Sequence, residues 1–313
     1  MKSACVFPGQ GSQSVKMLDQ LAQRYPLVQQ RYAQAGELLG YDLWQYVQQG
    51  PVEELNRTEV TQPAMLVAGY VVWELLQQHT AVRPAFLAGH SLGEYTALVC
   101  AGAISFEDAV ELVYHRGKFM QEAVAPGQGA MAAVLGLDDD AVIGACAEAA
   151  GDQVVAAVNF NTPGQVVIAG DKPAVERALE ACRTAGAKKT IVLPVSVPSH
   201  CALMKPAAEK LAQKLLDTTI RPPEIPVIHN YHVDTAADAD AIRQALVKQL
   251  YCPVKWVGVI NRLKDEGVGL IIESGPGKVL TGLCRRIDRK LPVSAVYDPE
   301  SLAVLANEKE EMS

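Results

Sequence analysis

The stretch that decides the fold is LAGHSLGEYTA, residues 87–97, whose centre GHSLG fits the pattern G-x-S-x-G. The apolar run PAFLAG (84–89) predicts a short strand, and the small residues that follow predict a helix. A sharp turn between a strand and a helix is the setting in which a serine is exposed as a nucleophile. Because the pattern also recurs by chance in loops rich in Gly and Ser, Ser91 is either a nucleophile or an ordinary loop serine. If it is a nucleophile, its acyl group passes to water or to another acceptor.

Strand and helix patterns alternate on both sides of this stretch. Such alternation is typical of an α/β fold with a mostly parallel sheet. We expect the tail after Tyr297 to fray. The predicted strands include SACVF (3–7), PAFLAG (84–89), EIPVIHN (224–230) and GLIIESGPG (269–277), and the predicted helices include 61–79 with Thr61 as N-cap, 199–217, 238–250, 256–267 and 278–288.

Residues 129–195 follow a different order, β-α-β-β-α-β, which is that of ferredoxin-like units. The acids of this region, such as Asp139 and Asp171, stand at helix ends and turns, where we expect caps and turn formers. We therefore expect two parts: a large α/β subdomain built from residues 1–125 and 196–313, and a small ferredoxin-like subdomain of residues 126–195.

Charge and cysteine content exclude several classes of function. The net charge of -7 argues against nonspecific binding to nucleic acid or to anionic membranes, since both require a cationic surface. No run approaches the ~18 apolar residues of a membrane-spanning helix. The 7 cysteines are widely spaced and form no C-x-x-C pair, which predicts a reduced, cytoplasmic protein without a zinc site. The histidines of HNYH (229–232) lack companion ligands for a metal.

A nucleophilic serine needs an oxyanion hole and a base. The backbone N–H of Leu92, at the start of the predicted helix, is one candidate donor. A second is the N–H of Gln10 in the loop FPGQGSQ (7–13), although such a loop could also cradle a phosphate. His200 stands at a strand-to-helix transition and is the best candidate base. No acid is an obvious third member, so a backbone carbonyl is the alternative partner for His200.

Arg116 stands in a stretch of apolar residues at helical spacing, YHRGKFMQEA (114–123). Two interpretations are open for it. Its aliphatic stem could cover apolar surface while the guanidinium stays in water. In an active site, its planar guanidinium could instead grip a carboxylate at two points.

Taken together, these stretches resemble the malonyl-CoA:acyl carrier protein transacylases of bacterial type II fatty-acid synthesis, the FabD family. The resemblance runs in collinear order from about residue 4 to about residue 290. The motifs that carry it are FPGQGSQ, GHSLGEY, RGKFMQEA, NFNTPGQVVIAG, VPSHCALM and ESGPGKVLTGL.

The resemblance implies a hydrolase-like core with a ferredoxin-like insert, and a ping-pong acyl transfer. Ser91 would carry the malonyl group, His200 would be the base, and Arg116 would pair with the malonyl carboxylate. The substrates would be malonyl-CoA and the phosphopantetheine thiol of acyl carrier protein, with no metal or bound cofactor. The remaining implied roles are oxyanion hole for the N–H groups of Gln10 and Leu92, orienting carbonyl for Gln249, and acyl pocket for His90, Met120, Met131 and Ser199.

Two rival functions differ from this interpretation in their chemistry. A serine hydrolase would use the same nucleophile, but plain acyl esters would leave a buried Arg116 unpaired, which is costly. A non-catalytic module that docks carrier protein would have no use for Ser91. An acidic carrier protein needs positive charge where it docks. The candidate basic residues, which could equally form a solvated face, are Lys188, Lys189, Arg285, Arg286, Arg289 and Lys290. We expect a monomer; the sequence determines neither the carrier protein nor the tolerance of other extender units.

Overall fold

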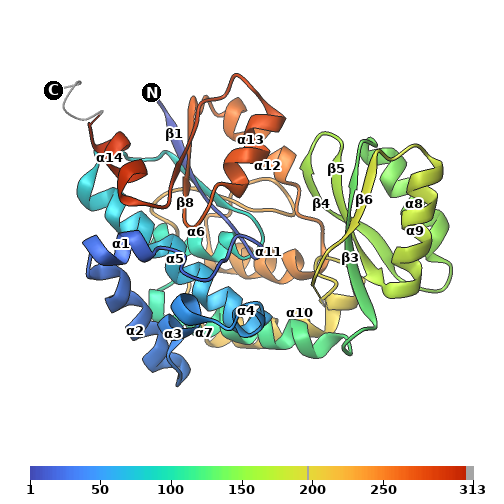
Figure 1. Ribbon diagram of the computed structural model, residues 1–313, viewed down its shortest axis with the longest axis horizontal. Coiled ribbons are helices and arrows are strands. Elements are labelled where there is room, and N and C mark those ends of the chain that lie inside the picture. The colour runs from blue at the N-terminus through green and yellow to red at the C-terminus, as the bar shows by residue number, and fades with distance from the viewer. Residues whose placement is uncertain (196, 308–313) are drawn as a thin grey trace.

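The computed structural model describes residues 1–195 and 197–307, which form two sheets with helices around them (Figure 1). Every neighbouring pair in the larger sheet is parallel. The predicted α/β class with a mostly parallel sheet is therefore confirmed. The last strand of the sheet, β9, was not predicted. The strand order is β7 (Val227–Ile228), β2 (Phe86–Gly89), β1 (Ser3–Phe7), β8 (Leu270–Ser274) and β9 (Val293–Val296).

Strand β1 is buried because helices cover both faces of the larger sheet. Successive side chains of a strand point to opposite faces. Ala4 and Val6 pack with the apolar residues of α12 (Trp256–Asp265) and α13 (Val279–Ile287). Cys5 and Phe7 pack on the other face, in the larger cluster that contains α5 (Thr58–His79). Because both faces are covered, the strand is apolar from Ala4 to Phe7, as expected for a buried parallel strand.

Two sequence predictions about helix ends need correction. Helix α5 begins at Thr58, with Arg57 as its N-cap, so Thr61 lies inside the helix and its hydroxyl donates to the backbone carbonyl of Leu55. The tail after Tyr297 also forms α14 (Pro299–Asn307), where a frayed end was expected; residues 308–313 lie outside the described residues. The other helices of this part are α1 (Asp19–Arg24), α2 (Leu27–Leu39), α3 (Leu43–Gln49), α4 (Val52–Leu55), α6 (Gly93–Cys100), α7 (Phe106–Ala123), the 3-10 turn η1 (Ala202–Met204), α10 (Lys205–Asp217) and α11 (Ala239–Tyr251).

The smaller sheet is antiparallel and is built from the β-α-β-β-α-β segment, as predicted. Helices α8 (Asp139–Ala150) and α9 (Lys172–Thr184) cover its outer face, on the right of Figure 1. On its inner face, Met131 packs in one cluster with Cys201, which follows His200 in the chain. The strand order is β4 (Val155–Thr162), β5 (Gln165–Asp171), β3 (Gly129–Leu135) and β6 (Lys189–Val192).

Backbone hydrogen bonds join the smaller sheet to the rest of the molecule. The N–H of Phe160 donates to the carbonyl of Val254 (3.0 Å), and the N–H of Val254 donates to the carbonyl of Val158 (2.8 Å). Strand β4 is thus fixed against the loop between α11 and α12, and Met131 on the inner face of the smaller sheet lines the same cavity as Ser91. In residues 1–195 and 197–307, none of the helices combines the length and apolar character needed to cross a membrane.

Candidate active site

The G-x-S-x-G stretch forms a tight turn between β2 and α6. Ser91 has a φ of 51°, in the left-handed region that L-residues rarely adopt. A Cβ at Gly89 would lie 1.9 Å from the carbonyl carbon of Gly93, and one at Gly93 would lie 2.0 Å from the carbonyl oxygen of Phe7. The two glycines are therefore required by close backbone packing. The turn places Ser91 at the carboxyl end of the parallel strands, where α/β proteins bind their ligands.

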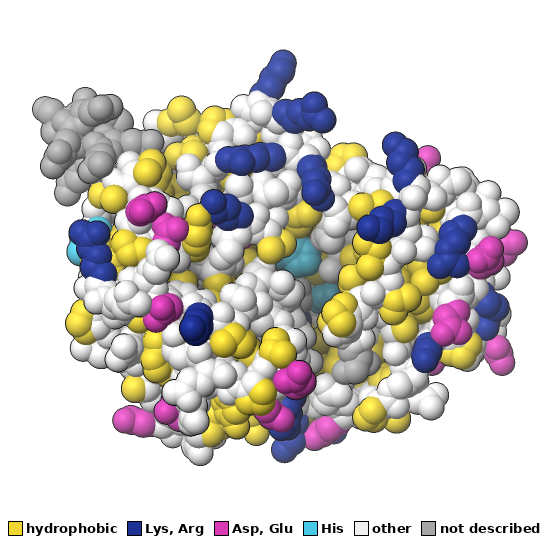
Figure 2. Space-filling model, viewed as in Figure 1, with side chains coloured by type: hydrophobic (Ala, Val, Ile, Leu, Met, Phe, Trp, Pro, Cys, Tyr) yellow, Lys and Arg dark blue, Asp and Glu magenta, His cyan; other side chains and the backbone are white. Residues whose placement is uncertain are grey.

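A cavity of about 460 Å³ opens beside this turn. Figure 2 shows a hollow between the two parts of the molecule with histidine side chains in it and Lys and Arg side chains around its upper side. Of the site residues predicted from the sequence, all but Gln249 line this cavity. They are Gln10, His90, Ser91, Leu92, Arg116, Met120, Met131, Ser199 and His200.

Ser91 and His200 are in direct contact. The hydroxyl oxygen of Ser91 lies 2.8 Å from Nε2 of His200, and Nδ1 of His200 lies 2.7 Å from the carbonyl oxygen of Gln249. A carbonyl oxygen can only accept, so Nδ1 carries the proton and the lone pair of Nε2 faces the serine hydroxyl. The carbonyl of Gln249 thus takes the place that an acid has in a Ser-His-Asp triad.

The surroundings of His200 keep its imidazole neutral. Its side chain is 3% exposed, and burial together with the nearby charge of Arg116 lowers its pKa to about 3. The hydrogen bond to Gln249 opposes this shift only in part. A neutral imidazole with a free lone pair is the form that can accept a proton from Ser91.

Arg116, on α7, brings a positive charge to the nucleophile. Its residue is 1% exposed, so the interpretation in which the guanidinium stays in water is wrong. Nη1 donates to Oε1 of Gln62 (2.8 Å), and Nη2 donates to Oε1 of Gln249 (3.0 Å) and to the hydroxyl of Ser91 (3.3 Å). Burial lowers its pKa, while Tyr95 opposes the shift. No Asp or Glu side chain of the described residues lies within 4.0 Å of this guanidinium.

Two backbone N–H groups at the cavity are free to bind an oxyanion. Gln10 lies in the loop after β1, and Leu92 lies at the N-terminus of α6. Within the described residues, neither N–H has a hydrogen-bond acceptor. The N–H of Ser91 itself is taken, because it donates to Oδ1 of Asn230 at 2.7 Å. The N–H groups of Gln10 and Leu92 are therefore candidate donors for a developing oxyanion.

His90 does not share the role of His200, although it is the neighbour of Ser91 in the chain. Its Nε2 lies 2.8 Å from Oδ1 of Asn161, and its ring packs 5.5 Å from the ring of Trp256. Burial lowers its pKa. The ring therefore lies on the cavity wall, in contact with the smaller sheet.

Sequence reasoning missed several polar residues of the site. Gln62 on α5 gave no signal, because a glutamine in an apolar helix looks like a surface residue. His229 and Asn230 were considered only as a metal motif, but Nδ1 of His229 lies 2.7 Å from Oε1 of Glu94. Their position directly after β7, at the same sheet edge as Ser91, is the signal that could have found them. Among the described residues, no three His, Cys, Asp or Glu side chains are grouped to hold a metal.

Comparisons with known proteins agree with this geometry. The acyl transferase domain family matches residues 4–295. The chain is 58% identical over 300 residues to the malonyl CoA-acyl carrier protein transacylase of Escherichia coli, covering 96% of this chain and 97% of that protein. The chain belongs to the malonyl CoA-acyl carrier protein transacylase family. The Bacillus subtilis transacylase of the same name is 44% identical over 302 residues, which cover 96% of this chain and 95% of that protein.

Solved structures of transacylases share the fold of this chain over nearly its full length. An acyl carrier protein S-malonyltransferase from Vibrio cholerae superposes with a TM-score of 0.95 at 55% identity, covering 97% of this chain and 100% of that one. A malonyl-transacylase solved in complex with its type II PKS acyl-carrier protein gives a TM-score of 0.97 at 53% identity, covering 98% and 100%. The resemblance and the fold class predicted from the motifs are thereby confirmed.

Proposed function

We propose that this transacylase transfers a malonyl group from malonyl-CoA to the phosphopantetheine thiol of an acyl carrier protein, through a malonyl ester of Ser91, in fatty-acid biosynthesis. The names of its relatives support the substrates. The assignment of roles to individual residues rests on the geometry of the cavity. In this proposal malonyl-CoA and the phosphopantetheine arm are substrates, and no step requires a metal or a resident cofactor.

One observation carries the proposal: the guanidinium of Arg116 is buried beside the nucleophile with only neutral partners. A buried charge without an opposite charge beside it is costly. A negatively charged substrate bound in the cavity would supply that opposite charge. A malonyl group attached to Ser91 ends in a free carboxylate within reach of that guanidinium. Arg116 would then bind this carboxylate through charge-assisted hydrogen bonds, which a neutral acyl group cannot offer.

In the first half-reaction the hydroxyl oxygen of Ser91 attacks the thioester carbonyl carbon of malonyl-CoA while Nε2 of His200 takes the hydroxyl proton. The tetrahedral oxyanion is bound by the N–H groups of Gln10 and Leu92. The C–S bond then breaks, and Nε2 returns the proton to the CoA sulfur. General base catalysis supplies about 10²–10⁴-fold, and each oxyanion donor about 10²–10³-fold.

The second half-reaction repeats these steps in reverse with a different thiol. His200 removes the proton of the phosphopantetheine thiol, whose sulfur attacks the malonyl ester, and Nε2 then protonates the departing Ser91 oxygen. The carboxylate bound at Arg116 also helps the base. It offsets the positive charge that disfavours the protonated form of His200, so the imidazolium can form during each transfer.

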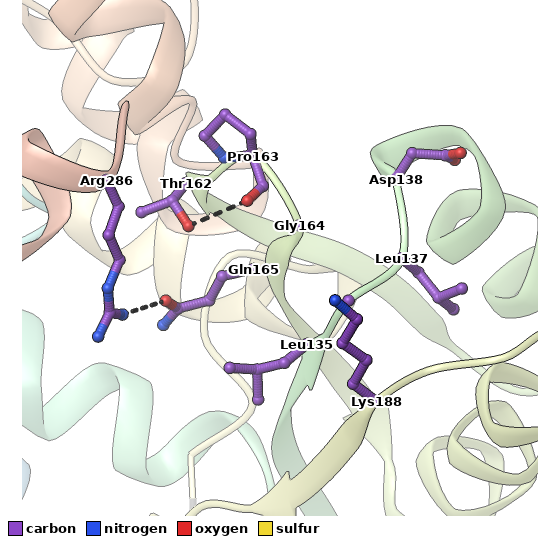
Figure 3. Close-up of a pocket in the computed structure, with 10 residues that line it drawn as sticks. Leu135, Leu137, Asp138, Thr162, Pro163, Gly164, Gln165, Lys188 and Arg286 are labelled. Carbon is purple, nitrogen blue, oxygen red and sulfur yellow. Dashed lines mark hydrogen bonds between the residues drawn. The ribbon is translucent and has the colours of Figure 1, made fainter. Parts of the chain in front are cut away.

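Docking of an acidic carrier protein would use the basic residues near the cavity. Lys188 and Arg286 line one groove of about 530 Å³, and Figure 3 shows them on either side of Gln165. Nη1 of Arg286 donates to Oε1 of Gln165 at 3.0 Å. Arg285, Arg289 and Lys290 line a second groove of about 490 Å³. Each groove is lined by one arginine of α13, Arg286 in the first and Arg285 in the second, so we propose this basic surface as the docking site.

We also propose a cytoplasmic monomer with two subdomains, residues 1–125 with 196–313 and residues 126–195. All seven cysteines are free, which suits a reducing compartment. The apolar cluster between the smaller sheet and its two helices draws all its members from residues 130–187, which supports a separate small unit.

Acyl-group selectivity tests the proposal. The protein is incubated separately with malonyl-CoA, acetyl-CoA and methylmalonyl-CoA, and its intact mass is measured with Ser91→Ala as the control. We expect a stoichiometric malonyl adduct that is absent from the control, and little acetyl adduct, because acetate lacks the carboxylate. Equal acetyl and malonyl labelling would contradict the role of Arg116, and equal labelling of Ser91→Ala would contradict the nucleophile. The extent of methylmalonyl labelling measures how far the site tolerates other extender units.

A further inference from the structure

Asn230 follows β7 directly and contacts the turn that holds the nucleophile. Oδ1 of its side chain accepts from the N–H of Ser91 at 2.7 Å, and Nδ2 donates to the carbonyl of Gly89 at 2.7 Å. The residue is 0% exposed and does not line the cavity. One planar amide thus bridges the backbone on both sides of His90 and closes the turn.

The bridge acts on a residue whose backbone is strained. A non-glycine residue in the left-handed region costs about 1–3 kcal/mol and persists only where its surroundings hold it. Ser91, with its φ of 51°, has both backbone polar groups hydrogen-bonded: its N–H donates to Oδ1 of Asn230, and its carbonyl accepts from Nε2 of Gln249 at 3.0 Å and from the N–H of Glu94 at 3.1 Å. The N–H of Ser91 is held by the side chain of Asn230 alone, so the direction of the serine hydroxyl toward His200 depends on this amide.

Asn230 is itself held by the helix that follows the nucleophile. Its backbone N–H donates to Oε2 of Glu94 at 2.8 Å, and Nδ1 of His229 lies 2.7 Å from Oε1 of the same carboxylate. Glu94 stands in the first turn of α6, where a negative charge is favourable, and is 0% exposed. With both carboxylate oxygens engaged, the carboxylate fixes the position of Asn230 relative to the turn.

We propose that Asn230, held by Glu94, is a positioning residue for the nucleophile. It has two effects. It holds Ser91 in the left-handed conformation that directs the hydroxyl to His200. It also occupies the N–H of Ser91, so that the oxyanion is bound by Gln10 and Leu92 alone. This inference rests on the proposed role of Ser91.

The test is single-turnover acylation of Asn230→Ala by malonyl-CoA, followed by intact mass against time. A positioning defect and a folding defect differ in this measurement. Loss of folded protein lowers the final fraction of labelled protein, while misplacement of the hydroxyl lowers the rate constant. Because misplacing a reacting group by about 1 Å costs about 100-fold, we expect a rate constant reduced about 10- to 100-fold. We also expect nearly all of the protein to be labelled at the end of the reaction. The malonyl-CoA concentration that gives half the maximal rate constant should stay within about twofold of that of the unaltered protein, since Asn230 does not line the cavity.

Thr80→Ala is the matched control. Thr80 is 3% exposed, its hydroxyl donates to the carbonyl of Leu76 and accepts from the N–H of Val82, and it does not line the cavity. It should keep the full rate constant whatever its stability. If Asn230→Ala gives no folded protein, Asn230→Asp keeps the shape and the acceptor for Ser91 but loses the donor to Gly89, and the same reduction is expected.

The outcomes separate this inference from the proposed function. A full rate constant in the folded Asn230 variant, with normal labelling of the unaltered protein, would overturn the inference and leave the proposed function standing. No label on Ser91 in the unaltered protein would overturn both. A reduced end point with an unchanged rate constant would show a purely structural role for Asn230 and would also overturn the inference.

Discussion

Nη2 of Arg116 lies 3.3 Å from the hydroxyl oxygen of Ser91, so the nucleophile shares one cavity with a guanidinium whose hydrogen-bond partners are all neutral. The neutral amides of Gln62 and Gln249 hold this guanidinium in place without cancelling its charge. The same charge disfavours protonation of His200. In the proposed function, selection of the acyl group and proton transfer by His200 are therefore coupled through this one side chain.

Replacing Arg116 by alanine should change which acyl group is accepted. A hydrogen bond to a charged group contributes about 1.5–3 kcal/mol, so kcat/KM for malonyl-CoA should fall at least about 10- to 100-fold. Neutral acyl groups, which gain nothing from the guanidinium, should react at least as well as before. The measurement is the ratio of kcat/KM for malonyl-CoA to that for acetyl-CoA. An unchanged malonyl preference in Arg116→Ala would refute this role.

Acylation should resist acid. Because burial and Arg116 lower the pKa of His200 to about 3, its base form persists as the pH falls through the usual histidine range, and only below that range does the proton bind. An ordinary histidine base with a pKa near 6.5 would lose about thirtyfold in kcat/KM at pH 5. We expect the kcat/KM of acylation to change by no more than about twofold between pH 7.5 and pH 5. A decline with a midpoint near 6.5 would show that the free enzyme has an unperturbed base.

Two glycine substitutions should have opposite effects on stability. In Gly93→Ala, the new methyl group would lie 2.0 Å from the carbonyl oxygen of Phe7. Overpacking of this kind costs about 1–3 kcal/mol, and the shift it forces would also slow acylation of Ser91. In Gly144→Ala, on α8, the methyl group would meet nothing within 4 Å, and the free energy of unfolding should rise by about 0.5–1 kcal/mol. Denaturant unfolding of both variants checks this; a neutral Gly93→Ala would contradict the packing argument.

Charge reversal on α13 should separate the two half-reactions. Arg285→Glu with Arg286→Glu should raise the KM for carrier protein several-fold, because rim charges steer encounter with an acidic partner. Acylation by malonyl-CoA, measured without carrier protein, should keep its rate. Reversal of Lys118, an exposed basic residue of α7 outside both grooves, is the control. An unchanged KM in the double variant would place the docking surface elsewhere.

The parts of the site that the sequence predicts are those with a local signature. The elbow around Ser91 follows from a strand, two glycines and a helix, and the alternation of elements predicts the parallel sheet. The side-chain roles of Gln62 and Gln249 have no such signature, because each depends on contacts between segments far apart in the chain. Gln249 Oε1 meets Arg116 across 133 residues, for example. The start of α5 was also missed, because Thr61 has the residue type of an N-cap while its hydroxyl pairs with Leu55.

The central claim is that Ser91 holds a malonyl group whose acceptor is a thiol and not water. It is tested most directly by preparing the malonyl-enzyme, removing free malonyl-CoA, and dividing the sample between buffer alone and buffer with phosphopantetheine-bearing acyl carrier protein. Intact mass of both proteins is then followed with time. The account predicts an adduct that persists in buffer and passes to the carrier protein within the time of mixing. Loss of the adduct at the same rate in both samples, with free malonate as the product, would contradict it and identify a hydrolase.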